Sequence, residues 1–370
     1  MNLYRPLLRP LLFRAEAETM HCLAIRAAEL ASSSRWLCSS VARRHCADSE
    51  RLEVAIGGLR FRTPLGLAAG FDKSARAVPF LAALGFGHVE VGSISAEPSA
   101  GNPKPRLFRI PQDRGIVVNY GLPNDGAERV AQRLAGLRAC APLGINIVST
   151  NRGAAAAAEP DDAVIADYLQ SVRRLQPVAD YLCLNLSCPN TREGRGFFHE
   201  PARLAQLLQG LDSLDGRGVA RPLFLKVAPF QSPAELETFL ATVKPARSVT
   251  GFSVNLPPGK PGGLRTPAWQ LGAMPGAVSG PPAMAAADRT LSELYRQMDR
   301  SRYRLIGSGG VFTAADAYRK IRLGASLVQL MTALMYEGPG VAAAINRELP
   351  RLLQADGVRH VSEAVGVDVL

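Results

Sequence analysis

A thiol between two amides is the feature of this chain that most directly suggests chemistry. In "NLSCPN" (185–190), Cys188 follows an alternating apolar run that predicts a strand, and Asn185 and Asn190 stand on either side of it. Asparagine is a poor strand former and a good hydrogen-bonding side chain, so two of them at a strand end suggest a polar ligand. A thiolate here could take a proton from carbon, although a buried cysteine that only fills space is the commoner case.

Other predicted strands also end in amides or amines. Lys73, Asn146, Lys226 and Asn255 lie in or just after four different apolar runs. A buried Asn or Lys must find a partner or lower the stability of the fold, so several of them are hard to explain by packing. Lys226 could form a Schiff base with a carbonyl substrate, or its cation could hold negative charge on a cofactor ring.

Two segments near the C-terminus predict a phosphate site. "GSGG" (307–310) and "MTALMYEGP" (331–339) each follow a predicted strand. Glycine lets backbone N–H groups approach an anion closely, and the last two loops of an α/β barrel often bind phosphate in this way. A plain tight turn is the alternative for "GSGG" alone.

The elements that must position these residues alternate between strand and helix from about residue 51. Strands are expected at 64–70, 88–93, 143–147, 181–187, 223–229, 249–255, 304–309 and 327–332. Helical patterns lie between most of them, such as 161–177, 201–213, 232–243 and 312–322. Eight such units predict an α/β fold, a (β/α)8 TIM barrel whose C-terminal strand ends face the active site. A doubly wound sheet is the alternative, but no GxGxxG follows the first strand. Two loops, 95–125 and 256–280, are unusually long, which is typical of functional loops.

The N-terminal residues 1–46 differ from the rest and are expected to form a helical extension of the barrel at 51–370. There are two short amphipathic patterns. The first places leucines such as Leu7 and Leu11 on one face and Arg5 and Arg9 off it, and the second has an apolar stripe that begins at Leu23. Such a pair can lie on a membrane interface, or it can pack as a lid on its own protein. Residues 32–50 are interpreted as a connector.

The composition restricts the classes of protein that need to be considered. The chain has 370 residues, 47% of them hydrophobic and 20% charged, with a net charge of +11. That composition is ordinary for a folded chain. The chain has no Lys/Arg tract with interleaved aromatic residues, which is the pattern that would indicate nucleic-acid binding. Six cysteines without CxxC or repeated spacing predict neither a metal site nor a disulfide framework. No apolar run reaches the roughly 18–20 residues of a spanning helix, and no signal-peptide pattern is present.

Together these motifs resemble a known family. "GLAAGFDKSA", "GNPKPRLFRIP", "LGINI", "LNLSCPNT", "LKVAP" and "GASLVQLMTAL" are similar to segments of the dihydroorotate dehydrogenases, and "FRAEAETMHCLAIRA" resembles the two-helix extension of their membrane-associated, quinone-using class 2. The resemblance implies an FMN-dependent oxidation of (S)-dihydroorotate to orotate in de novo pyrimidine (UMP) biosynthesis. It also implies a quinone that enters between the N-terminal helices, and a peripheral position at the cytoplasmic face of a bacterial inner membrane.

The resemblance also implies a role for each matching residue. Cys188 stands where the family keeps its catalytic base. The substrate would contact Lys73, Asn119, Asn124, Asn185, Asn190 and Asn255. FMN would contact Ala69, Gly70, Ser93, Asn146, Asn185, Lys226, Ser279, Gly280, Gly309, Gly310, Met331 and Thr332.

The chain departs from the family pattern at four positions. Class 2 members usually have serine where Cys188 stands, and cysteine is typical of the soluble class 1. In "VNYGLPN" (118–124), Val118 falls on the first asparagine of the orotate loop, and Asn119 is displaced by one. Leu256 replaces a Thr or Ser that meets the orotate carboxylate, and Met331 replaces an aromatic residue.

These departures leave other functions open. Each lost polar contact could remove about 1–3 kcal/mol of binding free energy. The first alternative is therefore an FMN-dependent oxidoreductase of the same fold that acts on a different small cyclic or unsaturated acid. A non-catalytic flavin-binding or membrane-associated protein and a Schiff-base aldolase acting through Lys226 are the others.

Overall fold

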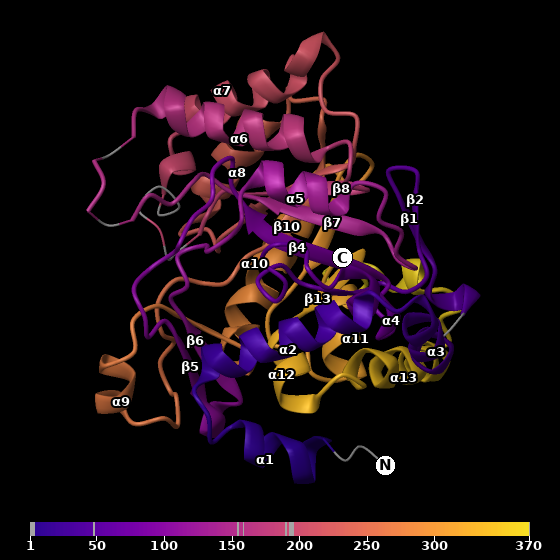
Figure 1. Cartoon of the computed structure of the whole chain (residues 1–370). Helices are drawn as coiled ribbons and strands as arrows, with labels where there is room; N and C mark the ends of the chain where they lie inside the picture. The colour runs from indigo at the N-terminus through magenta and orange to yellow at the C-terminus, as the bar shows by residue number, and fades with distance from the viewer. Residues whose placement is uncertain are drawn as a thin grey trace.

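Eight parallel strands close into a barrel in the computed structural model, which describes residues 4–46, 49–153, 155–157, 159–188, 191 and 196–369 (Figure 1). The barrel confirms the predicted fold class, and the doubly wound alternative is wrong because the sheet has no open edge. The order around the barrel is β10-β12-β13-β3-β4-β7-β8-β9. The strands are β3 (Leu65–Leu67), β4 (His88–Ile94), β7 (Leu143–Ile147), β8 (Tyr181–Asn185), β9 (Leu223–Val227), β10 (Val249–Val254), β12 (Arg304–Gly307) and β13 (Leu327–Leu330).

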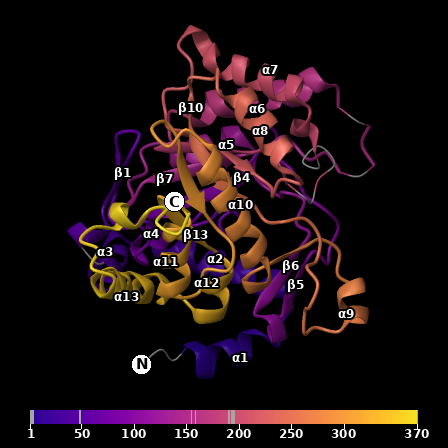
Figure 2. The same ribbon diagram turned by 180° about the vertical axis from the view of Figure 1, so that it is seen from behind.

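Helices cover the outside of the barrel, as the sequence predicted for residues between the strands. Figure 2 shows α10, α11 and α13 on the side of the molecule opposite to that of Figure 1. Several helices begin at recognisable signals, such as the capping box that Thr313 and Asp316 form at the start of α11. The helices are α4 (Val78–Ala83), α5 (Ala127–Leu134), α6 (Asp161–Leu175), α7 (Pro201–Asp212), α8 (Pro233–Val243), α10 (Met284–Gln297), α11 (Ala314–Arg322), α12 (Thr332–Glu337) and α13 (Val341–Ala355).

The two long loops of the sequence meet in a small antiparallel sheet that the strand patterns did not predict. Its strands are β5 (Leu107–Ile110), β6 (Gly115–Val118) and β11 (Ala277–Ser279), in the order β11-β6-β5. The short helix α9 (Ala268–Gly272) belongs to the second loop. Because β11 pairs with β6, the sheet brings two loops from distant parts of the sequence together beside the barrel.

A hairpin made of β1 (Val54–Ile56) and β2 (Leu59–Phe61) precedes the barrel. The buried side chains of Ile56 and Phe61 pack in one cluster with apolar side chains from the barrel strands, among them Phe224 and Leu327. These contacts attach the hairpin to the barrel.

The N-terminal residues form helices, as predicted. A π-helical turn, η1 (Tyr4–Leu8), leads into α1 (Arg9–Leu12), and α2 (Ala17–Ser32) follows. The interpretation of residues 32–50 as a connector is wrong, because α3 (Arg35–His45) begins there with the Ser34 side chain as its N-cap. None of the helices described, from η1 to the C-terminus, is long and apolar enough to cross a membrane.

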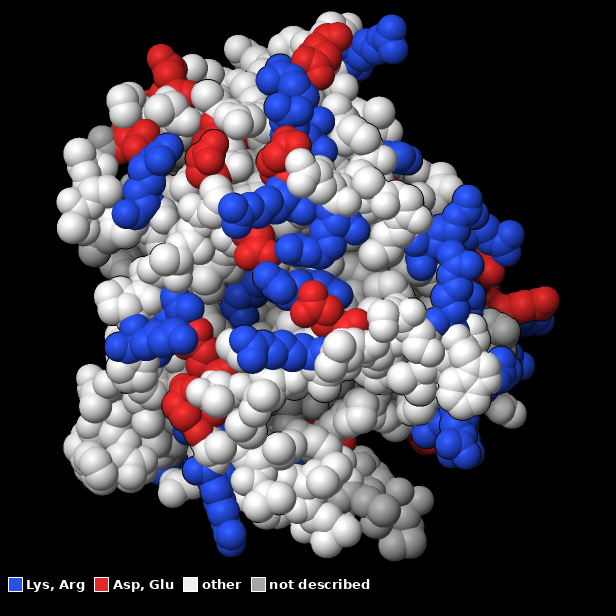
Figure 3. Space-filling model, in the orientation of Figure 1, with Lys and Arg blue, Asp and Glu red and all other residues white. Residues whose placement is uncertain are grey.

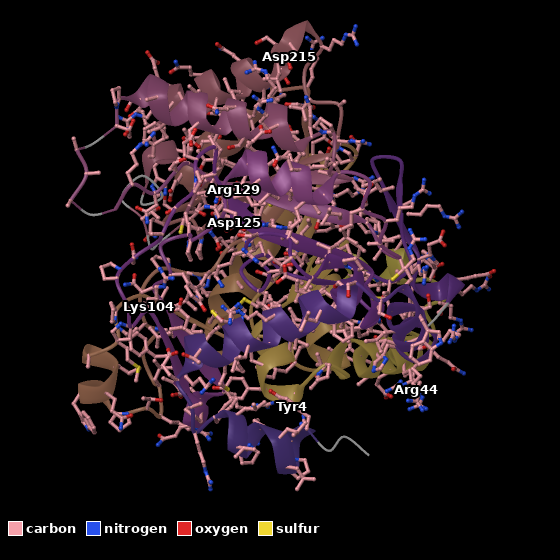
Figure 4. All side chains as sticks on the ribbon, viewed as in Figure 1. Tyr4, Arg44, Lys104, Asp125, Arg129 and Asp215 are labelled. Carbon is pink, nitrogen blue, oxygen red and sulfur yellow. The ribbon has the colours of Figure 1, made fainter. Side chains whose placement is uncertain are left out.

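The first turn of the chain packs on α12. Figure 4 shows Tyr4 between α1 and α12. Its hydroxyl donates to the Met335 carbonyl oxygen over 2.6 Å, Arg9 donates to the Tyr336 carbonyl oxygen, and Arg5 pairs with Glu337. The opposite face exposes Leu7, Leu8 and Leu11, which are 63%, 52% and 62% accessible. One face of this segment therefore packs on the protein while the other presents apolar side chains to the surroundings.

Candidate active site

A pocket with a cavity volume of about 190 Å³ opens at the C-terminal ends of the barrel strands. In an α/β barrel this is the end where active sites form, because loops from every strand converge there. The predicted site residues that line it are Ala69, Gly70, Lys73, Ser93, Asn185, Cys188, Lys226, Asn255, Ser279, Gly280, Gly309, Gly310, Met331 and Thr332. Asn190 lies outside the described residues.

One part of the pocket is built from glycines and hydroxyls. Gly309 and Gly310, after β12, have positive φ angles of +87° and +77°. A Cβ on Gly310 would come within 2.8 Å of the Met284 side chain, so this turn requires glycine. The hydroxyl oxygens of Ser279 and Thr332 lie 2.5 Å apart beside it. Glycine backbone and paired hydroxyls suit the oxygens of a phosphate group.

A polar network connects the ends of several barrel strands. Asn146 donates to Glu90 over 2.9 Å and accepts a short hydrogen bond from the Ser93 hydroxyl. The side-chain amide of Asn185 donates to the Ser93 hydroxyl over 3.2 Å. The side-chain amide of Asn255 in turn donates to the side-chain oxygen Oδ1 of Asn185 over 3.0 Å. The network satisfies these buried groups and holds Asn185 and Asn255 at the pocket wall.

Cys188 is buried and lines the same pocket, three residues beyond the end of β8. The backbone before it is anchored, because the Asn185 carbonyl oxygen accepts from Tyr168 over 2.7 Å and the Ser187 hydroxyl donates to the Lys226 carbonyl oxygen over 3.2 Å. A thiol held in a fixed place beside two amides can exchange a proton with a bound ligand.

Lys73 forms part of the wall of the same pocket. Burial lowers the pKa of the Lys73 ammonium to about 8. The Lys73 Nζ lies 3.7 Å from the centre of the Tyr120 ring, which is a favourable place for a cation. The pocket therefore combines an amine with a lowered pKa, a thiol, two fixed amides and the glycine turn in one space.

Comparison with known proteins identifies the family that has this arrangement. The family model described as dihydroorotate dehydrogenase matches residues 51–353. A relative named dihydroorotate dehydrogenase (quinone) from Natronomonas pharaonis is 38% identical over the full length of both chains. The mouse mitochondrial protein of that name is 37% identical over 99% of this chain and 91% of its own. The chain belongs to the dihydroorotate dehydrogenase family.

Solved structures agree with this placement. The crystal structure of DHODH from Eimeria tenella in complex with ferulenol superimposes with a TM-score of 0.80 at 31% identity, over 96% of each chain. The matching relatives carry the designation "(quinone)" and extend over the N-terminal helices as well as the barrel, which identifies the chain as a class 2 member. The family consists of flavin-dependent oxidoreductases that act on CH–CH groups.

Part of the pocket wall is apolar. Val118 at the end of β6 and Leu256 after β10 both line it, so the two departures found in the sequence face the same space as Cys188. Leu122 and Pro257 extend this wall. This part of the wall offers no side-chain hydrogen-bond donor to a ligand.

Three predicted residues do not line the pocket. Asn119 accepts from Asn102 over 3.1 Å and borders a neighbouring hollow instead. Asn124 is buried and donates to the Ser95 hydroxyl and to the Leu122 carbonyl oxygen. Asn146 lies behind Ser93 in the network described above. The side chains of all three take part in hydrogen bonds within the protein.

Sequence reasoning did not single out three residues at this site. Tyr120 lines the pocket under Lys73, and Gln329 lines it from β13, fully buried, with its amide donating to Glu90 over 2.8 Å. His21 of α2 approaches Lys73 from outside, with 3.2 Å between its Nε2 and the Lys73 Nζ. A glutamine inside the apolar run "LVQLM" was the one available signal.

Proposed function

We propose that the protein oxidises (S)-dihydroorotate to orotate, with FMN as its flavin and a quinone as electron acceptor, in the de novo synthesis of pyrimidines. The observation that carries this proposal is the position of Cys188 in the pocket, beside Asn185 and Asn255 and in one space with the glycine turn. The membership of the chain in class 2 supports the choice of acceptor.

The pocket residues fit FMN. The turn at Gly309 and Gly310 and the hydroxyls of Ser279 and Thr332 would hold the phosphate. Gln329 has a buried Oε1 with no hydrogen-bond partner among the described residues, which suits a donor on a bound ring. Lys226, buried on β9, would place its cation beside that ring.

Each residue near the thiol has a distinct task in this reaction. Bound FMN supplies the hydride acceptor. The Cys188 thiolate would remove the proton from the neighbouring carbon of the substrate, and Asn185 and Asn255 would orient the ring through its amide groups. The Lys73 ammonium would attract the carboxylate while it remains charged.

We further propose that the N-terminal segment docks on a membrane surface, at the cytoplasmic face of a bacterial inner membrane, and admits the quinone. The support is the row of exposed leucines Leu7, Leu8 and Leu11 on the side turned away from α12. In Figure 3 the end of the molecule around α1 has few charged side chains, and most Lys and Arg lie above it.

Anaerobic mixing of the purified protein with dihydroorotate, without quinone, tests the proposed reaction. The expected result is loss of the visible absorbance of the oxidised flavin, followed by its return when a quinone is added. A yellow protein that keeps its colour with dihydroorotate would exclude this substrate, and a colourless protein would exclude flavin chemistry altogether.

A second candidate function has one observation in its favour. The apolar wall of Val118 and Leu256 suits a small cyclic or unsaturated acid with less polar surface than dihydroorotate. If that is the substrate, dihydroorotate should bleach the wild-type flavin slowly, and the double variant Val118→Asn/Leu256→Thr should bleach at least about tenfold faster at low substrate, since each restored hydrogen bond contributes about 1 kcal/mol. A slower reaction in the double variant would count against the second candidate.

A further inference from the structure

Helix α2 forms the outer wall of the candidate active site at Lys73. A hollow on the outer side of the pocket wall is bordered by Glu18, His21 and Ile25 of α2 on one side and by Lys73 and Tyr120 on the other. The same two side chains also line the main pocket. Lys73 and Tyr120 therefore separate the two spaces, and α2 covers them from outside.

His21 contacts Lys73 directly. The His21 Nε2 lies 3.2 Å from the Lys73 Nζ, and the imidazole packs edge-on against Phe71 with 5.1 Å between ring centres. Burial and the charge of Lys73 hold the pKa of His21 well below its usual value, so its ring is neutral. A neutral ring that presents Nε2 to an ammonium group carries its proton on Nδ1, and Nε2 then accepts the hydrogen bond.

Glu18 acts on the surroundings of Lys73 through an ion pair with Arg106. The Glu18 carboxylate accepts from the Arg106 guanidinium over 2.8 Å and 3.1 Å, and both residues are buried. Arg106 also donates to the carbonyl oxygen of Asn102 over 2.8 Å and lies 5.5 Å from the Tyr120 ring centre. Lys73 lies over that ring, so the ion pair fixes the surface that Lys73 rests on.

The charges around this cluster reinforce the arrangement. Lys104 lies toward the same end of α2 (Figure 4), with its Nζ 3.7 Å from the Glu18 carboxylate, but its side chain is largely exposed and contributes little. The Glu18–Arg106 pair is different because it is buried. Loss of one buried partner leaves the other charge without compensation, so the pair acts as a unit.

We propose that His21 and Glu18 are positioning residues of the active site, which hold Lys73 at the pocket wall, so that α2 is part of the catalytic unit and not only a covering segment. The consequence for catalysis rests on the proposed function. The consequence for Lys73 itself does not, because it follows from contacts within the chain.

The two residues should act on Lys73 in opposite directions. Burial is the largest cause of the lowered pKa of Lys73. Removal of the His21 ring lets water reach the ammonium and take the place of the Nε2 acceptor, so the hydrogen bond is replaced while the burial is relieved, and that pKa should rise toward its ordinary value. Glu18 favours the charged form, so its neutralisation should lower the pKa further. The charged or titratable groups that act on the Lys73 pKa are Cys22, Glu18 and Asp72, which raise it, and Arg106, which lowers it.

Trace acetylation measures this pKa in the protein as isolated. The protein is exposed to a small amount of acetic anhydride at a series of pH values, and mass spectrometry of the peptide that contains Lys73 gives the labelling midpoint. Wild type is expected to have a midpoint near 8. His21→Ala should raise the midpoint by about one unit and increase the labelling rate, whereas Glu18→Gln should lower it.

Two further variants make the result specific. His21→Gln keeps a hydrogen-bond acceptor and should stay close to wild type. Arg26→Ala removes an exposed side chain from the same helix and the same hollow, and it should leave Lys73 unchanged. The proposal is overturned if His21→Ala labels like wild type, if His21→Gln or Arg26→Ala shifts the midpoint as far as His21→Ala does, or if Glu18→Gln raises it.

Single-turnover flavin reduction by dihydroorotate, without quinone, separates this inference from the proposed function. We expect His21→Ala to reduce the flavin at least tenfold more slowly than wild type and His21→Gln to recover most of the rate. If wild type itself is not reduced, the proposed function fails while the labelling result still stands. If wild type and His21→Ala are reduced equally fast, α2 does not belong to the catalytic unit and the inference fails.

Discussion

At the scale of single residues, one thiol should determine the rate of flavin reduction. Cys188 is fixed in the pocket wall by the anchored backbone of Asn185 and Ser187. Cys188→Ala should still bind flavin and ligand but reduce the flavin orders of magnitude more slowly in stopped-flow measurements, because no other base replaces the thiolate. Cys188→Ser should keep some activity, with its pH dependence shifted upward, because a hydroxyl loses its proton less readily than a thiol. If Cys188 only fills space, the alanine variant would lose about 1 kcal/mol of stability and react at a near wild-type rate.

The amine of Lys226 can be tested in the same way. The residue is buried on β9 and lines the pocket. If its cation stabilises negative charge on the reduced flavin, Lys226→Ala should lose FMN or slow flavin reduction severely, while Lys260→Ala, which removes an exposed lysine, should behave like wild type. Flavin content is measured by absorbance after gel filtration. Trapping of a carbonyl compound on Lys226 with borohydride would instead support a Schiff-base enzyme.

At the scale of elements, the segment η1–α1 has two faces with different tasks. Contacts of Tyr4 and Arg9 hold one face on α12, and leucines occupy the other. Leu7→Ser/Leu11→Ser should therefore reduce flotation with anionic lipid vesicles and slow the reduction of a long-chain quinone, while flavin reduction by substrate stays unchanged. Val367→Ser, at an exposed apolar residue outside the extension, is the matched control. Equal flotation of the double variant and wild type would contradict membrane docking by this face.

At the scale of the whole molecule, the buried His88 should make the fold sensitive to acid. It is fully buried in the barrel, and burial lowers its pKa from 6.5 to about 3. Between these values the unfolded chain binds a proton that the folded barrel does not, so stability rises with pH across that window and is lost as pH falls below about 6.5. When the pH is lowered from 7 to 5, protonation of His88 in the unfolded chain should decrease the free energy of unfolding by about 2 kcal/mol.

Denaturant unfolding at both pH values measures this effect. The difference in unfolding free energy between wild type and His88→Gln should shrink by about 2 kcal/mol on going from pH 7 to pH 5, because only wild type carries the acid-sensitive histidine. His199→Gln, at an exposed histidine, should have no such trend. A pH-independent difference for His88→Gln would mean that His88 is not held neutral in the fold.

The sequence by itself determined the barrel and many of the polar residues and glycines that line its pocket. Strand and helix patterns depend on side chains a few positions apart, so alternating apolar runs and capped helices could be recognised locally. The ends of parallel strands meet at one edge, and for that reason Lys73, Asn185, Lys226 and Asn255 could be expected to converge. Several buried Asn and Lys residues at strand ends are hard to explain by packing alone, and this could be said from the sequence before any contact was known.

Only the tertiary structure decided how segments far apart in the sequence meet. The pairing of β11 with β6, which brings the two long loops together, has no local signal, because strand pairing is set by packing and register. Asn119 and Asn124 matched a motif, and the structure places both outside the lining of the pocket, with internal hydrogen bonds to Asn102 and Ser95. His21 lies in an amphipathic helix, where a histidine is unremarkable, and its role beside Lys73 follows only from the docking of α2, since contacts across 52 residues depend on the packing of whole elements.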